Sequence, residues 1–286
     1  MRFGWLGMSK TALDAELVFD RFLGDTNVLS VLGSALARKA PRWSTGLYIR
    51  KSPKERVLVD VRDSGAISKA VLETAGERGP TYRALVSRYN KGDERIFGSV
   101  EFGGSTADLV IVVGVDEKPL SRIAGRLLMG NHITVQVRKS KIEELDAAAW
   151  LSELFVELCR NTSPVWGSVR DDKEYWTKVM TESPVVSAIG RDFGKYLPGL
   201  FWMNFFGKPY VKLIGKSRLA STPSVTVQEV DEGLCLKLYE DPFKWSESLN
   251  RKSEEKALQH IGVQYFFQKE NQAPETVSPW TRETSN

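Results

Sequence analysis

The sequence has few of the residues on which most enzyme active sites depend. Its 286 residues include two cysteines, Cys159 and Cys235, and two histidines, His132 and His260. The cysteines are too few and too isolated for a disulfide framework or a zinc site, and each lies among apolar residues, so we expect two buried free thiols. Two histidines leave few candidates for a histidine-based metal site or for acid–base catalysis.

Long apolar runs and long basic runs are also absent from the sequence. No stretch approaches the roughly 20 apolar residues that a membrane-spanning helix requires, and Asp14 and Glu16 closely follow a briefly apolar N-terminus that lacks the apolar core of a signal peptide. The formal net charge is +4, and no run of lysine and arginine suits a nucleic-acid backbone. We therefore expect a cytoplasmic protein that binds neither membranes nor nucleic acids.

Acidic residues are concentrated in one part of the chain. The composition as a whole, with 42% hydrophobic and 27% charged residues, is typical of a soluble globular protein. Residues 141–192, however, contain 10 acidic and 6 basic residues. The acidic positions considered are Glu143, Glu144, Asp146, Glu153, Glu157, Asp171, Asp172, Glu174 and Glu182. They form either a solvated face or a surface complementary to a basic partner, which would speed association more than it would add affinity.

The first half of the chain predicts two helices followed by several strands. Apolar residues at helical spacing predict helices over residues 11–23 and 27–39. Apolar runs bounded by turn residues then predict strands. These strands cover Leu47–Lys51, Arg56–Val61, 96–103, 107–115 and 132–138, with a short helix over 68–75 between them. Because residues 107–115 are apolar almost throughout, we expect this strand at the centre of the sheet.

The second half of the chain alternates helices and strands. Ser140 to Glu143 match a capping box, which predicts that a helix begins there and ends before Pro164. The further predicted elements are a helix over Asp171–Met180, an aromatic strand over 199–206, a helix over 209–214, a hairpin of Val225–Val230 with Leu234–Tyr239, and a helix over 253–268. The segment 273–286 is polar and contains proline, which predicts a disordered tail.

These elements together predict an α+β fold with a mixed, mostly antiparallel sheet flanked by helices. No internal repeat, heptad array or low-complexity linker divides the sequence. We therefore expect one compact domain over residues 1–272, in which two lobes would meet near residue 140.

Two short motifs resemble catalytic or ligand-binding sites, but turns explain both. Gly98–Ser105 is rich in glycine, yet it lacks the Lys-Ser/Thr ending and the helix that follow in a phosphate-binding loop. The carboxylates at 231–232 and 240–241 lie where the predicted hairpin turns and where it ends, positions at which acidic residues are usually solvated. We therefore predict no catalytic residues, no metal site and no cofactor.

Aromatic residues are frequent in the second half of the chain. They are Trp166, Tyr175, Trp176, Tyr196, Trp202, Phe205, Phe206 and Trp245. Most of them are expected in the core, although tryptophan and tyrosine also dominate the energetics of protein–protein interfaces. Asn204 is the polar member of the run Trp-Met-Asn-Phe-Phe, so its amide either pairs with buried backbone groups or faces a partner.

Several of these motifs follow one another in an order that resembles a known family. They are Phe97-Gly-Ser-Val-Glu-Phe-Gly-Gly104, Gly130-Asn131, a helix containing Trp150, Pro164-Val-Trp-Gly167 with Glu174 after it, Pro198-Gly-Leu-Phe-Trp-Met-Asn-Phe-Phe-Gly207, Leu213-Ile-Gly215 and Glu232-Gly233. In this order they resemble the immunity protein 52 family of bacterial polymorphic-toxin and type VI secretion systems. The resemblance spans roughly residues 45–245 and consists of turn and aromatic motifs.

The resemblance implies a cytoplasmic protein that binds a cognate bacterial toxin and blocks it without chemistry of its own. The residues expected near the partner are Trp166, Glu174, Trp202 and Asn204, together with the acidic positions Glu153, Glu157, Asp171 and Asp172. One alternative is an enzyme, a hydrolase that reverses a toxin's product or modification. A second is a phage-defence or structural adaptor component, whose partner would not be a toxin.

Overall fold

The computed structural model describes the chain in segments. They are residues 12–21, 23, 26–39, 47–50, 56–59, 63–66, 97–104, 109–116, 120–123, 126–129, 131–138, 147–179, 190, 192–268 and 277–280. The chain divides into two compact units. The N-terminal unit comprises residues 15–120 and 129–164, and the C-terminal unit comprises residues 1–14, 121–128 and 165–286. The chain therefore passes between the units several times.

An antiparallel sheet forms the N-terminal unit. Its strand β5 (Leu109–Asp116) pairs with β4 (Phe97–Gly104) on one side and with β8 (Asn131–Arg138) on the other. Beyond β4, strands β2 (Leu47–Arg50) and β3 (Arg56–Val59) form an antiparallel hairpin. The predicted strands and the central place of the apolar strand are confirmed, while the helix predicted over 68–75 lies outside the described residues.

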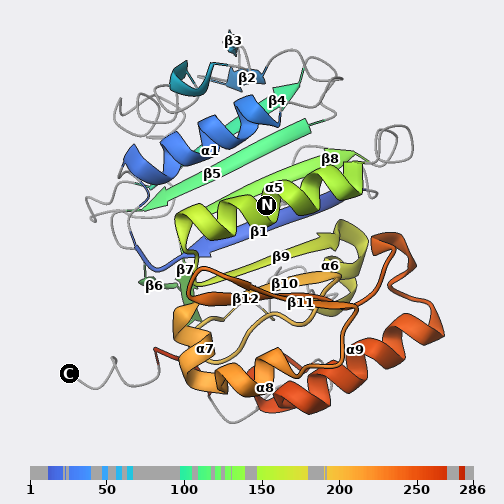
Figure 1. The fold of residues 1–286 in the computed structure, drawn as a ribbon. Helices are drawn as coiled ribbons and strands as arrows, with labels where there is room; N and C mark the ends of the chain where they lie inside the picture. The colour runs from blue at the N-terminus through green and yellow to red at the C-terminus, as the bar shows by residue number, and fades with distance from the viewer. Residues whose placement is uncertain are drawn as a thin grey trace. The chain divides into compact units, whose positions relative to one another are not determined.

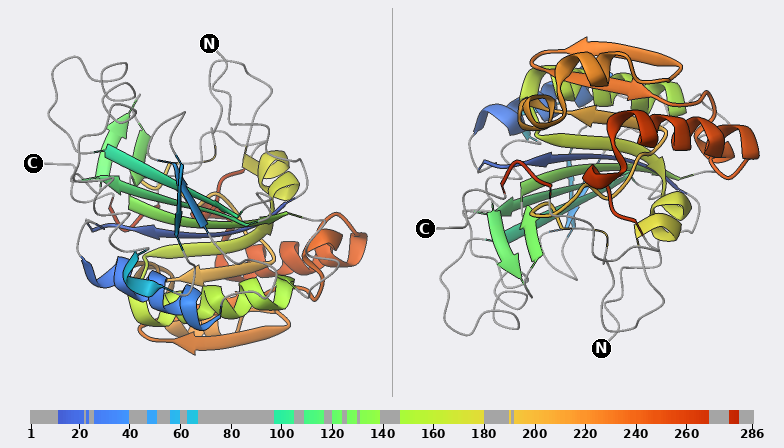
Figure 2. Two further views of the ribbon diagram at one scale, coloured as in Figure 1. Left: turned by 90° about the horizontal axis from the view of Figure 1, so that it is seen from above. Right: turned by 90° about the horizontal axis from the view of Figure 1, so that it is seen from below.

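Two helices, α1 (Thr26–Arg38) and α5 (Ala147–Thr162), lie side by side on one face of this sheet (Figure 1, Figure 2). Each turns an apolar stripe inward, as its helical spacing predicts. The buried residues of α5 include Ala147, Leu151, Leu154, Phe155 and Leu158, and those of α1 include Val28, Leu29, Leu32, Ala35 and Leu36. Both predicted helices are confirmed, although the capping box at 140–143 lies outside the described residues.

The helix predicted over residues 11–23 is wrong, because Ala12–Phe19 forms strand β1. All eight residues of β1 are buried, including the carboxylates of Asp14 and Glu16. A strand buried on both faces loses the apolar–polar alternation that normally marks a strand, and a short apolar run then fits helical spacing equally well. Residues 15–19 of β1 belong to the N-terminal unit, where the strand lies next to β8.

A second antiparallel arrangement forms the C-terminal unit, in the strand order β11-β12-β10-β9. Strand β10 (Met203–Phe206) pairs with β9 (Trp166–Asp171) and with β12 (Gly233–Lys237). Strand β11 (Thr226–Val230) forms the predicted hairpin with β12. Sequence reasoning missed β9, because glycine, serine and arginine interrupt its apolar residues although the whole strand is buried.

The helices of the C-terminal unit are α6 (Asp172–Val179), α7 (Lys208–Ile214), α8 (Lys216–Ala220) and α9 (Ser248–Ile261). Smaller elements are the strands β6 (Leu120–Ile123) and β7 (Arg126–Met129), which form a separate two-stranded sheet, and the 3₁₀ turns Pro242–Lys244 and Val263–Tyr265. The predicted α6 and α7 are confirmed. Helix α9 begins and ends earlier than predicted. It ends at Ile261 because Gly262, the next residue, takes a positive φ of 120°.

Part of the C-terminal segment packs against the C-terminal unit. The backbone N–H of Val277 donates to the carbonyl of Lys195 over 3.1 Å, and Ser278 and Trp280 are buried. The Trp280 ring lies edge-on to Tyr210, with ring centroids 5.5 Å apart. Val277, Ser278 and Trp280 are therefore packed in this structure, and the rest of the segment 273–286, for which composition predicts a disordered tail, lies outside the described residues.

Candidate functional site

Four of the residues expected near a partner are buried in the C-terminal unit. Trp166, Glu174 and Asn204 have no exposed surface, and Trp202 is 3% exposed. The Trp202 indole donates to the carbonyl of Tyr239 over 2.7 Å. The Asn204 amide accepts from the N–H of Phe201 over 2.9 Å and donates to that residue's carbonyl over 2.8 Å. This corrects the sequence-based choice of these four as surface residues, because in this conformation their side chains build the core.

Glu174 belongs to a buried polar cluster, which we call the Lys178 clasp. It consists of Glu174 and Lys178 on α6, Glu254 on α9, Tyr239 after β12 and the carbonyl of Leu200. Lys178 donates to Glu174 over 2.6 Å, to Glu254 over 2.7 Å and to the Leu200 carbonyl over 2.8 Å. The Tyr239 hydroxyl donates to Glu174 over 3.0 Å. One ammonium group thereby joins two helices and the segment before β10.

The clasp changes how its members bind protons. Burial raises the pKa of Glu174 from 4.5 to about 7, although the Lys178 charge and hydrogen bond oppose this effect. Burial by itself would lower the pKa of Lys178, but the two carboxylates outweigh it and raise that pKa above its usual value. Among the described residues, the second carboxylate oxygen of Glu174, Oε2, has no hydrogen-bond partner. A buried oxygen without a partner favours the neutral carboxyl group, so Glu174 takes up a proton near neutral pH.

The outer side of α6 carries an exposed aromatic side chain. Trp176 is 42% exposed, and its indole donates to the carboxylate of Asp172 over 2.8 Å. Asp172 lies one turn earlier on the same helix, so this bond restricts the ring without burying it. Sequence reasoning noted Trp176 among the aromatic residues but did not choose it. Trp176 lies two residues from both Glu174 and Lys178. On a helix, this spacing places Trp176 on the side opposite to these two residues, so the sequence does indicate its position.

The start of α6 is fixed by charged groups. Asp171 is buried and accepts from the backbone N–H of Lys173 over 2.9 Å, as an N-terminal cap does. Burial raises the pKa of Asp172, and Asp171 adds to this effect, whereas Trp176 and Arg170 oppose it. The Arg170 guanidinium lies 4.1 Å from the ring centroid of Tyr175. These contacts stabilise the first turn of the helix that carries Trp176.

The predicted acidic residues Glu153 and Glu157 lie on α5 in the N-terminal unit. Glu153 pairs with Lys39 over 2.8 Å, while Glu157 pairs with Arg38 and lies 3.8 Å from Lys39. The Glu153 side chain is 66% exposed, and that of Glu157 is 16% exposed. Their charges are thus balanced by Arg38, the last residue of α1, and by Lys39, which follows it.

Within the described segments of the chain, no group of three or more His, Cys, Asp and Glu side chains could hold a metal ion. Among the described helices, none has the length and apolar character needed to cross a membrane.

The fold belongs to the α+β class, as predicted. No family model matches the sequence, so the resemblance to the immunity protein 52 family is not confirmed. No curated protein matches the sequence either. Among solved structures, the chain is similar to the Pseudomonas aeruginosa T6SS protein PA0821, with 13% sequence identity and a TM-score of 0.48. That alignment covers 95% of this chain and 79% of the other.

Proposed function

We propose that this protein binds a cognate bacterial toxin in the cytoplasm and blocks it as a stoichiometric inhibitor, without chemistry of its own. The observation that carries the proposal is Trp176, a half-exposed tryptophan held in one orientation on α6. Tryptophan is enriched among the residues that dominate binding energy at protein interfaces. The resemblance of the sequence to a family of immunity proteins supports a toxin as the partner.

The support behind Trp176 suits it to this role. The Lys178 clasp joins the inner side of α6 to α9, and Asp172 restricts the indole ring on the outer side. A contact residue that is already ordered loses little conformational entropy on binding, so more of its contact energy contributes to affinity. Asp172 also places a carboxylate beside the ring, which suits a partner with a basic group near its aromatic-binding pocket.

Co-expression tests the proposal. Each gene beside this one would be induced in a bacterial host with and without this protein, and the two products would be purified together. We expect one neighbour to be toxic, and this protein to restore growth and to co-purify with that neighbour in a fixed ratio. Absence of a toxic neighbour, or rescue without a complex, would contradict the proposal.

Substitution of Trp176 tests the binding surface. We expect Trp176→Ala to weaken the complex by about 2 kcal/mol, or roughly 30-fold in Kd, while the free protein stays folded. Leu249→Ala is the matched control, because Leu249 is a 75% exposed apolar residue on α9 of the same unit. Titration calorimetry measures both variants against the toxin. Equal affinities for the two variants would show that Trp176 does not contribute to the interface.

A hydrolase that reverses the toxin's effect is the second candidate, favoured by one observation. Glu174 has a pKa of about 7, which suits a general acid or base at neutral pH. Its side chain has no exposed surface, so a substrate would reach it only after α6 or α9 moved. Glu174→Gln separates the two candidates: an inhibitor keeps its rescue activity in this variant, whereas a hydrolase that uses Glu174 loses it.

A further inference from the structure

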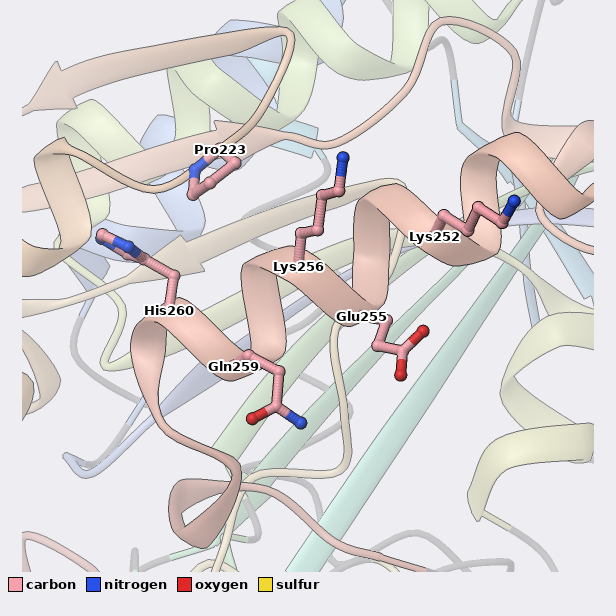
Figure 3. A pocket seen from close by; sticks show the side chains of 6 residues that line it. All are labelled: Pro223, Lys252, Glu255, Lys256, Gln259 and His260. Carbon is pink, nitrogen blue, oxygen red and sulfur yellow. The ribbon is translucent and has the colours of Figure 1, made fainter.

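The outer face of α9 carries a row of basic residues beside a hollow. Lys252, Lys256 and His260 follow one another at four-residue intervals, so they lie on one side of the helix. Together with Pro223 and two further residues of α9, Glu255 and Gln259, they line an open hollow of about 460 Å³. Figure 3 shows Lys256 and His260 on the side of Pro223, whereas Glu255 and Gln259 extend to the other side of the helix.

The two lysines of this row have no carboxylate partner among the described residues. Other lysines of the same unit do have one: Lys208 pairs with Glu232, Lys216 with Glu229, Lys237 with Glu240 and Lys244 with Asp241, all within 3.9 Å. Two like charges at positions i and i+4 destabilise a helix by a few tenths of a kcal/mol. The row therefore keeps an unbalanced positive charge at a small cost to the helix.

Helix α9 is fixed in place behind this row. Its inner side buries Ala257 and Ile261, and Glu254 pairs with Lys178 of the clasp over 2.7 Å. Nε2 of His260 lies 2.9 Å from the carbonyl of Arg218 and 3.0 Å from the Ser221 hydroxyl. Because a carbonyl oxygen only accepts, Nε2 carries a hydrogen and donates it. The imidazole is thus tied to α8, and the helix that carries the basic row is held in place.

We infer that this row docks an acidic segment of a protein partner, with two carboxylates about 6 Å apart. The spacing follows from the helix, since four residues rise by about 6 Å between Lys252 and Lys256. Glutamates four residues apart on a helix have this spacing. Alternate residues of an extended strand are about 7 Å apart, which is close to it. A nucleic acid fits the row less well, because two lysines beside a glutamate carry too little charge to follow a phosphate backbone.

This inference is independent of the toxin proposal, so it is tested with defined probes. A fluorescent helical peptide with glutamates at i and i+4 would be titrated with the full-length protein at low and high salt. The comparison probes are the same peptide with glutamine for glutamate, a short DNA duplex and inorganic phosphate. Fluorescence anisotropy reports peptide and duplex binding, and displacement of the bound peptide reports phosphate binding.

We expect the glutamate peptide to bind, the glutamine peptide not to bind, and added salt to weaken the complex. The double variant Lys252→Glu with Lys256→Glu should lower affinity about tenfold or more. Lys212→Glu is the matched control, because Lys212 is an exposed lysine of α7 in the same unit without a carboxylate partner among the described residues, and it should bind as the wild type does. Circular dichroism checks that the variants are folded.

Three results would overturn the inference. They are equal binding of the peptide by the double variant and the wild type, an equal loss in Lys212→Glu, and tighter binding of the duplex or of phosphate than of the peptide. If the double variant fails to fold, nitrogen-15 chemical shifts of the wild type decide the matter. Peptide-induced shifts confined to α9 and residues near Pro223 would support the inference, and shifts elsewhere would refute it.

Discussion

Glu157 on α5 and Glu174 on α6 come from the same acidic stretch of sequence, but their surroundings differ. Glu157 lies on the surface of the N-terminal unit and pairs with Arg38, whose side chain is 64% exposed. Glu174 is fully buried in the C-terminal unit and shares Lys178 with Glu254. Exposed ion pairs contribute about 0–1 kcal/mol, whereas removal of one partner from a buried pair leaves an uncompensated charge and costs about 3–5 kcal/mol. The same acidic stretch therefore supplies weak ion pairs at the surface of one unit and a strongly stabilising cluster in the interior of the other.

The comparison predicts the largest loss of stability when Lys178, the cation shared by Glu174 and Glu254, is removed. Lys178→Ala removes the ammonium group that Glu174 and Glu254 share, together with its three hydrogen bonds, and we expect the free energy of unfolding to fall by about 3 kcal/mol or more. Lys39→Ala, the matched change at the α1–α5 surface pairs, should cost about 1 kcal/mol or less. Urea denaturation measures both. Similar losses would show that the clasp and the surface pairs are energetically alike.

A second effect concerns pH. The pKa of Glu174 is raised on folding from 4.5 to about 7, so the folded protein holds this proton more tightly than the unfolded chain does. The resulting stabilisation is complete below pH 4.5 and is lost as the pH rises towards and through 7, with a total of roughly 3 kcal/mol. Glu174→Gln keeps a neutral, hydrogen-bonding group and should flatten this part of the profile. Urea midpoints between acidic and slightly basic pH measure it, and identical slopes in both proteins would contradict the assignment.

The smallest effect is expected at the surface pairs. Glu153→Lys with Glu157→Lys replaces attraction to Lys39 and Arg38 by repulsion, and we expect a loss of about 1 kcal/mol. If the toxin is basic and contacts this surface, the double variant should also associate more slowly at low salt. Stopped-flow kinetics would measure the association rate. An unchanged rate would show that this acidic surface does not contribute to association with the toxin. Asp171 is left out of the test, because it is buried and caps α6.

Patterns in the sequence predicted most of the fold, and burial explains where they failed. Helices α1, α5 and α6 and the hairpin of β11 and β12 follow from local spacing and turn residues, which act within a few residues of the chain. Strands β1 and β9 were missed because both are buried along their whole length. In such strands, tertiary contacts set which residues are tolerated, and the two-residue period that marks a strand disappears.

The candidate site was less predictable than the fold. Composition drew attention to the residues around α6, but it did not separate Glu174, which is buried, from Trp176, which is exposed. The buried position of Glu174 depends on a cluster that includes Glu254, which lies 76 residues from Lys178 in sequence. Such long-range pairs leave no periodic signal in one sequence. The basic row of α9 was likewise not noticed, because its charges are diluted by acidic neighbours along the chain.

The central claim is that this protein acts by occupying its toxin and not by turning over a substrate. A titration of toxin activity with increasing amounts of this protein tests it most directly. We predict that activity falls linearly and is lost at one fixed molar ratio, and that Glu174→Gln inhibits as well as the wild type does. Silencing of many toxin molecules by one molecule of this protein, with loss of that activity in Glu174→Gln, would contradict the account and identify an enzyme.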